Sequence, residues 1–174
     1  MTPQRHTALV IASSWDGVPI LESERVRVAL SLTAEVLAVD VESPFHGDPP
    51  PPGPAGSCDG LWEFEVVEVF LVGEDERYLE IELSPHGHHL ALQLHHPRQV
   101  TARDLPVRYR CSREGGWWRG RAEVSAALLP PGLATVNAFA IHGIGPERRF
   151  LAAHPTGGER PDFHRIAGFP SLDW

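Results

Sequence analysis

Hydrophobic and polar residues alternate along most of this chain, in short runs separated by glycine and proline. A period of two is typical of β-strands, because successive side chains of a strand point to opposite faces of the sheet. The pattern predicts strands at residues 7–13, 25–32, 35–41, 61–71, 78–83, 88–94, 107–113, 117–124, 134–144 and 148–153. The only predicted helix is a turn at Ser125–Leu129, which Pro130 and Pro131 close. We therefore expect an all-β protein, a two-sheet antiparallel β-sandwich of jelly-roll type with at most one short helix.

A proline-rich loop interrupts these strands at residues 44–60. Proline has no backbone N–H, so this segment is not a central strand, and we expect a loop that is locally stiffened into polyproline geometry. Neither an internal repeat nor a second composition follows it. The 174 residues fit one domain, so we expect a single β-sandwich domain over residues 1–174.

Composition excludes several classes of function. The formal net charge of −8 argues against nucleic acid as a partner, because proteins that bind nucleic acid need concentrated positive charge. All 15 basic residues are arginine, which is typical of a GC-rich genome and excludes a Schiff-base or P-loop lysine. Cys58 and Cys111 form no CxxC pair, and we expect two free thiols. Because we find no signal peptide and no apolar run of about 18 residues, we expect a cytoplasmic protein without a membrane partner.

The segment from Tyr78 to Leu94 reads as a hairpin around Ser84–Gly87, which suits a type I turn. Such a turn places Glu82 opposite His89, and we expect Glu80 and Glu82 on the outward face. The opposite, buried face would then hold Leu79, Ile81, Leu90 and Leu92. A Glu82–His89 pair is either acid–base machinery or an ordinary surface pair.

Ten histidines raise the question of a metal site, and the candidate ligands are Glu82, His86 and His89. The chain contains no HExxH motif and no spaced Cys/His pairs of a zinc module. We therefore expect no cofactor, with Ca²⁺ or another divalent ion as the alternative.

Glu68 is the carboxylate that strict alternation places least comfortably. In the predicted strand 61–71 it falls on the same face as Trp62 and other aromatic residues, opposite the face of Glu65. A β-bulge at Val66–Val67 would instead bring Glu68 and Glu65 to one face. Without the bulge, a carboxylate among aromatic side chains needs a partner. Both arrangements are typical of functional sites.

Three further positions are candidates for binding. Trp117 alternates with arginine and glutamate, so it either stacks on a sugar ring or is covered by arginine side chains. Asn137 shares a strand face with apolar residues. The motif Asp162–Arg165 either locks the terminal segment through an ion pair or joins Glu68, Glu65 and Asp48 in a polar pocket.

Several motifs resemble a small, functionally uncharacterised family of DOMON-like proteins found in bacteria and animals. They are Asp48-Pro-Pro, Leu61-Trp-Glu-Phe-Glu-Val-Val-Glu-Val-Phe, Tyr78-Leu-Glu-Ile-Glu-Leu-Ser-Pro-His-Gly-His-His-Leu, Asn137-Ala-Phe-Ala-Ile-His-Gly143 and Pro161-Asp-Phe-His-Arg165. More distantly, the chain is similar to family 9 carbohydrate-binding modules. The resemblance implies a two-sheet β-sandwich with a small ligand on a concave sheet, and we expect a bacterial source. Haem binding through a Met–His pair is not implied, because Met1 is the only methionine.

Three hypotheses of function follow. The first is a non-catalytic protein that binds a small polar, saccharide-like ligand through Trp62, Glu65, Glu68, Asn137, Asp48 and Trp117. The second is a metal-assisted hydrolase or lyase that uses Glu68 or Glu82 with His86 or His89. The third is a structural or interaction domain without a ligand.

Overall fold

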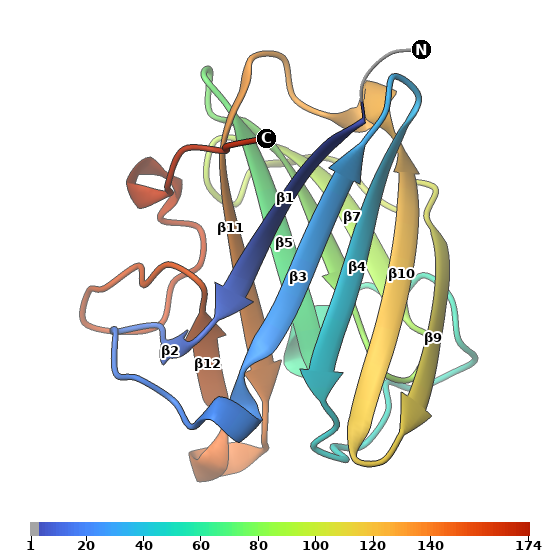
Figure 1. Cartoon of the computed structure of the whole chain (residues 1–174), viewed down its shortest axis with the longest axis vertical. Coiled ribbons are helices and arrows are strands. Elements are labelled where there is room, and N and C mark those ends of the chain that lie inside the picture. Colours follow the sequence, from blue (N-terminus) through green and yellow to red (C-terminus); the bar gives the residue numbers. More distant parts are fainter. Residues whose placement is uncertain (1–3) are drawn as a thin grey trace.

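Two antiparallel β-sheets pack face to face in the computed structural model, which describes residues 4–174 (Figure 1). The predicted β-sandwich is confirmed. The five-stranded sheet has the order β1 (Arg5–Ile11), β3 (Val26–Leu32), β4 (Val36–Pro44), β10 (Trp117–Ser125) and β9 (Arg108–Glu114). The seven-stranded sheet has the order β2 (Ser13–Ser14), β12 (Arg149–Ala152), β11 (Leu133–His142), β5 (Val66–Gly73), β6 (Arg77–Leu83), β7 (His89–His95) and β8 (Val100–Ala102).

In residues 4–174 helical structure is confined to single 3₁₀ turns. These are η1 (Glu22–Glu24), η2 (Leu61–Glu63), η3 (Ala126–Leu128), η4 (Gly145–Glu147) and η5 (Ile166–Gly168). The predicted helical turn is confirmed as η3, which the Ser125 hydroxyl caps by accepting the N–H of Ala127. Residues 4–174 contain no helix long and apolar enough to cross a membrane.

The seven-stranded sheet is buried on both faces. Its inner face meets the five-stranded sheet across a core that includes Val69, Ile81 and Trp118. Its outer face carries a second core, in which Phe163 and Phe169 of the C-terminal segment pack with the side chains of the sheet. Figure 1 shows this segment in red beside β11 and β12. Every residue of β5 is therefore buried, which explains why its sequence is almost continuously apolar.

The predicted register of the β6–β7 hairpin is wrong by one residue. Leu83 pairs with His89, and Glu82 pairs with Leu90. Gly87 is the reason: its φ of 86° is left-handed, and it follows the turn as an extra residue of a G1 bulge. Because side chains alternate, the one-residue shift moves every side chain of β7 to the other face. The outer face of the sheet, where Tyr78, Glu80 and Glu82 lie, therefore also carries Leu90, Leu92 and Leu94.

No bulge interrupts the start of β5. Val66 pairs with Ile141 and Val67 with Ala140, and the register continues without a break to Val72. Strict alternation therefore holds, and Glu68 lies on the outer face with Phe70 and Phe139.

Candidate functional site

Three buried carboxyl groups lie together on the outer face of the seven-stranded sheet. Glu68 of β5 is directly opposite Glu82 of β6, and Glu80 follows two residues along on the same face. Their exposed fractions are 2% for Glu68, 3% for Glu80 and 0% for Glu82. The expectation that Glu80 and Glu82 face outward into solvent is therefore wrong, because the second core covers that face. We call these three residues the carboxyl cluster.

The carboxyl cluster has few partners. Oε1 of Glu68, Oε2 of Glu80 and both side-chain oxygens of Glu82 are buried without a hydrogen-bond donor from residues 4–174. Burial, and then the charge of Glu80, raises the pKa of Glu68 well above its ordinary value. Burial and the charges of its two neighbours likewise raise the pKa of Glu82. Protonated carboxylic acids are thereby favoured.

Glu80 differs from the other two members in its pKa. Burial raises that pKa to about 7, and the neighbouring Glu82 and the charge of Arg98 oppose the rise. Two carboxyl groups at short distance do not both ionise readily, which favours the protonated form of Glu82. Near neutral pH, Glu80 is the member closest to ionisation.

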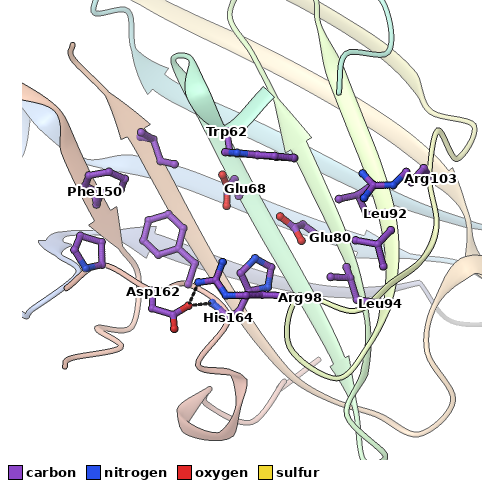
Figure 2. A pocket seen from close by; sticks show the side chains of 14 residues that line it. Trp62, Glu68, Glu80, Leu92, Leu94, Arg98, Arg103, Phe150, Asp162 and His164 are labelled. Carbon is purple, nitrogen blue, oxygen red and sulfur yellow. Dashed lines mark hydrogen bonds and ion pairs between the residues drawn. The ribbon is translucent and has the colours of Figure 1, made fainter. Parts of the chain in front are cut away.

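A cavity of about 380 Å³ opens over Glu68 and Glu80. Apolar side chains form most of its walls, among them Leu92, Leu94, Val100, Ile141 and Phe150. Figure 2 shows the two carboxyl groups on neighbouring strands, with Trp62 on one side and the pair of Arg98 and Asp162 on the other. The arrangement of apolar walls with a few convergent polar groups is typical of small-molecule sites.

The C-terminal segment closes one side of the cavity with residues 161–164. Asp162 accepts a hydrogen bond of 2.7 Å from the guanidinium of Arg98, so the predicted ion-pair lock is present. Asp162 also lines the same cavity as Glu68, as the alternative prediction had it, although Glu65 and Asp48 lie elsewhere. Phe163 stacks on Phe139 with 4.0 Å between ring centroids.

Tyr78 and His164 fix the other end of this closure. The Oη atom of Tyr78 lies 2.6 Å from Nδ1 of His164 and accepts the backbone N–H of Arg98. Burial raises the pKa of Tyr78 well above its ordinary value, and burial lowers the pKa of His164 to about 4. The tyrosine is therefore the donor and the neutral imidazole the acceptor.

Trp62 lies at the rim of the cavity in η2, not in a strand as predicted. Its side chain is 40% exposed. The guanidinium of Arg148 donates to the backbone carbonyls of Trp62 at 2.6 Å and of Glu63 at 2.8 Å, which holds η2 in place. An aromatic ring is thus held at the entrance with much of its surface free.

The other four predicted binding residues have different surroundings. Glu65 accepts the backbone N–H groups of His46 and Asp48, and Asp48 in turn accepts that of Gly143 at 2.6 Å. Asn137 is buried and is bonded to the backbone of His154. These three residues anchor loops. Trp117 is half-buried in β10 and pairs with Pro44 of β4, so it lies in the five-stranded sheet, away from the cavity.

The candidate metal ligands are not brought together. His86 bonds the carbonyl of Asp48 at 3.1 Å, whereas His89, beside Leu83, belongs to the inner face and lies against Tyr109. Glu82 is on the outer face, so the predicted Glu82–His89 pair is wrong. In the described part of the chain, no group of three or more His, Cys, Asp or Glu residues is placed to hold a metal ion.

The sequence did not indicate Glu80, Arg98 or Arg103 as cavity residues, whereas His164 belongs to the motif Asp162–Arg165 that one alternative placed beside Glu68. Glu80 lies on the predicted face of β6, but the Gly87 bulge brings Leu90, Leu92 and Leu94 to that face, and the second core buries it. Arg98 follows β7 and Arg103 follows β8. The sequence around them does not indicate that their side chains lie over the outer face of the sheet.

Comparisons with known proteins add a family and a fold. No family model matches the chain. A human protein named UPF0462 protein C4orf33 is 37% identical over 173 residues, covering 94% of this chain and 86% of its own. Its mouse homologue is 38% identical over 168 residues and covers 91% and 87%.

One solved structure matches the whole sandwich. A Bacteroides uniformis protein, provisionally described as carbohydrate-binding, superposes with a TM-score of 0.71 at 17% identity, covering 97% of this chain and 85% of that one. This likeness shows the fold alone. The sequence relatives are vertebrate and carry no DOMON name, so they support neither the expected bacterial source nor the DOMON assignment. Sequence identity above one third along most of both chains indicates shared ancestry. The chain therefore belongs to the UPF0462 family.

Proposed function

We propose that this protein is a binding protein for a small polar, saccharide-like ligand, which occupies the cavity over Glu68 and Glu80. The observation that carries the proposal is that two carboxyl groups, each at least nine-tenths buried, have an oxygen without a hydrogen-bond partner and line a cavity of about 380 Å³. Buried polar groups are nearly always hydrogen-bonded, so a ligand with several hydroxyl groups would supply the hydrogen-bond donors that these oxygens lack.

The aromatic rim supports a ring-shaped ligand. Trp62 offers a flat apolar surface beside polar groups, which suits the face of a sugar ring. Arg98 and Arg103 line the same cavity and can donate to ring hydroxyls. The structural likeness to a protein provisionally described as carbohydrate-binding is consistent with this ligand class.

Two predicted stacking residues provide a test. Saturation-transfer NMR with a panel of neutral monosaccharides and disaccharides first selects a ligand, and calorimetry then measures its affinity. Trp62→Ala is expected to weaken binding about tenfold, since an aromatic contact of about 1.4 kcal/mol is lost. Trp117→Ala is the matched control, because Trp117 lies on the other sheet, and its affinity should equal that of the wild type.

Two results contradict the proposal. One is a panel in which no saccharide binds at millimolar concentration. The other is binding that Trp62→Ala leaves unchanged, which would place the sugar outside this cavity.

A further inference from the structure

The cavity contains more carboxyl groups than cations to neutralise them. Arg98 is paired with Asp162, and Arg103 is paired with Asp59 at 3.1 Å. Arg148 influences Glu68 through its charge, but its hydrogen bonds go to the carbonyls of Trp62, Glu63 and Gly143. No guanidinium of residues 4–174 donates a hydrogen bond to the carboxyl cluster.

The titratable and charged groups near the cluster come from every side of the cavity. Around Glu68, Glu80 and Glu82 they are Tyr78, Arg98, Arg103, Arg148, Asp162, His164 and Asp59. The remaining wall residues from β7, β11 and β12 are apolar. The ion pairs and hydrogen bonds of these arginines go to groups outside the cluster, so no arginine is paired with its carboxyl groups.

We propose that the ligand of this cavity is an amino sugar whose protonated amine binds between the carboxyl groups of Glu68 and Glu80. The inference rests on the proposed function, from which it takes the saccharide ring, and it names the substituent that the ring carries.

An ammonium group fits this floor better than a hydroxyl group does. An ammonium has three N–H donors and no acceptor, and the two carboxyl groups offer unpartnered acceptor oxygens. Charge-assisted hydrogen bonds are roughly twice as strong as neutral ones. A neutral hydroxyl, by contrast, brings no positive charge that would stabilise an ionised carboxyl group.

The proton balance follows from the same contact. When the ammonium binds, its positive charge favours ionisation of the nearest carboxyl, and the proton goes to solvent. Because the pKa of Glu80 lies at about 7, that residue is the expected source of the proton near neutral pH. Binding of an amino sugar is therefore coupled to proton release, and binding of a neutral sugar is not.

The experiment compares three probes on the full-length protein near pH 7: D-glucosamine, N-acetyl-D-glucosamine and D-glucose. Calorimetry in phosphate buffer measures the affinities, and a pH indicator in unbuffered salt solution measures released protons. We expect D-glucosamine to bind at least about tenfold more tightly than both neutral probes and to release protons that the neutral probes do not.

Two isosteric variants locate the effect. In Glu68→Gln and in Glu80→Gln, the affinity of D-glucosamine relative to that of D-glucose should fall to within about twofold. Each variant is compared with Glu35→Gln, which removes an exposed carboxyl from the β3–β4 turn and should keep the preference. Two variants are used so that one remains informative if the other fails to fold.

The outcomes separate this inference from the proposed function. If D-glucose binds as tightly as D-glucosamine, the amine inference falls and the saccharide proposal stands. If no saccharide binds, both fall. If D-glucosamine is preferred but both glutamine variants keep the preference, the amine binds elsewhere and the inference is overturned.

Discussion

The most direct test of the carboxyl cluster is the pH dependence of stability in Glu80→Gln. The amide has the same shape as the carboxylic acid but carries no titratable proton. Glu80 in the unfolded chain titrates near 4.5, and in the folded protein its pKa is about 7. Between these values the folded protein holds a proton that the unfolded chain has lost, so stability falls as pH rises.

The size of the effect comes from the shift itself. Each unit of pKa is worth about 1.4 kcal/mol, so the rise from 4.5 to about 7 costs the wild type about 3 kcal/mol across this window. The stabilising contribution of protonated Glu80 is complete below the unfolded pKa and lost as pH passes the folded pKa. Glu80→Gln should therefore become more stable relative to the wild type, by about 3 kcal/mol, from about pH 4.5 to about pH 8.

The expected difference is a minimum. The charge of Glu80 also raises the pKa values of Glu68 and Glu82, and the neutral amide relieves both. Urea unfolding followed by tryptophan fluorescence at a series of pH values gives the free energies of unfolding. Glu35→Gln serves as the control and should parallel the wild type. If Glu80→Gln also runs parallel to the wild type within about 0.5 kcal/mol, Glu80 titrates as a solvated group and the reasoning fails.

Three further changes test contacts that stabilise the fold and the closure of the cavity. Glu65→Gln weakens the hydrogen bonds to the backbone N–H groups of His46 and Asp48. The free energy of unfolding in urea should fall by about 2 kcal/mol, while saccharide affinity stays unchanged. An unchanged free energy of unfolding would mean that other contacts hold the loop of His46 and Asp48. Tyr78→Phe removes the 2.6 Å hydrogen bond to His164. The free energy of unfolding should fall by about 1 kcal/mol, and amide hydrogen exchange should accelerate at residues 161–168. Equal exchange rates in both proteins would contradict the role of Tyr78 in holding the C-terminal segment over the cavity. Gly120→Ala places a methyl group 2.7 Å from Oη of Tyr109 and 2.9 Å from the Trp118 ring. Because this crowding costs about 2 kcal/mol, calorimetry should show a melting temperature lower by about 6 °C. A melting temperature at or above that of the wild type would contradict this packing.

Most of the fold was predictable because the strands follow the alternation of their side chains. The predicted run from residue 117 to 124 became β10, with Trp118, Ala122 and Val124 in the core as expected. Glu68 was also found from the sequence, since strict alternation left it on an aromatic face and no bulge relieves it. Local patterns carry this information because each strand side chain must point to one face or the other.

The rest of the site depends on contacts that local patterns do not contain. A single left-handed glycine, Gly87, puts every β7 side chain on the face opposite to the predicted one, so Leu90, Leu92 and Leu94 share the face of Glu80 and Glu82. The alternation around Trp62 was read as a strand, but the backbone forms a 3₁₀ turn that Arg148, far along the chain, holds through backbone carbonyls. Exposure of a sheet face is equally nonlocal, because the C-terminal segment determines whether the outer face meets water.

The cost of the carboxyl cluster bears on the choice between a binding protein and a purely structural domain. Neighbouring positions on the same face of the sheet carry Val66, Phe70 and Val72, so this face accommodates apolar side chains readily. Buried ionisable groups without partners destabilise a fold, and apolar residues of similar volume are often neutral or stabilising in their place. A domain that served only as a scaffold would gain stability from an apolar residue at position 68 or 80. Departures from such local rules concentrate at functional sites, where a ligand completes the missing bonds. Two of the three residues of the carboxyl cluster, Glu68 and Glu80, line the cavity, and this placement favours a binding protein over a purely structural domain.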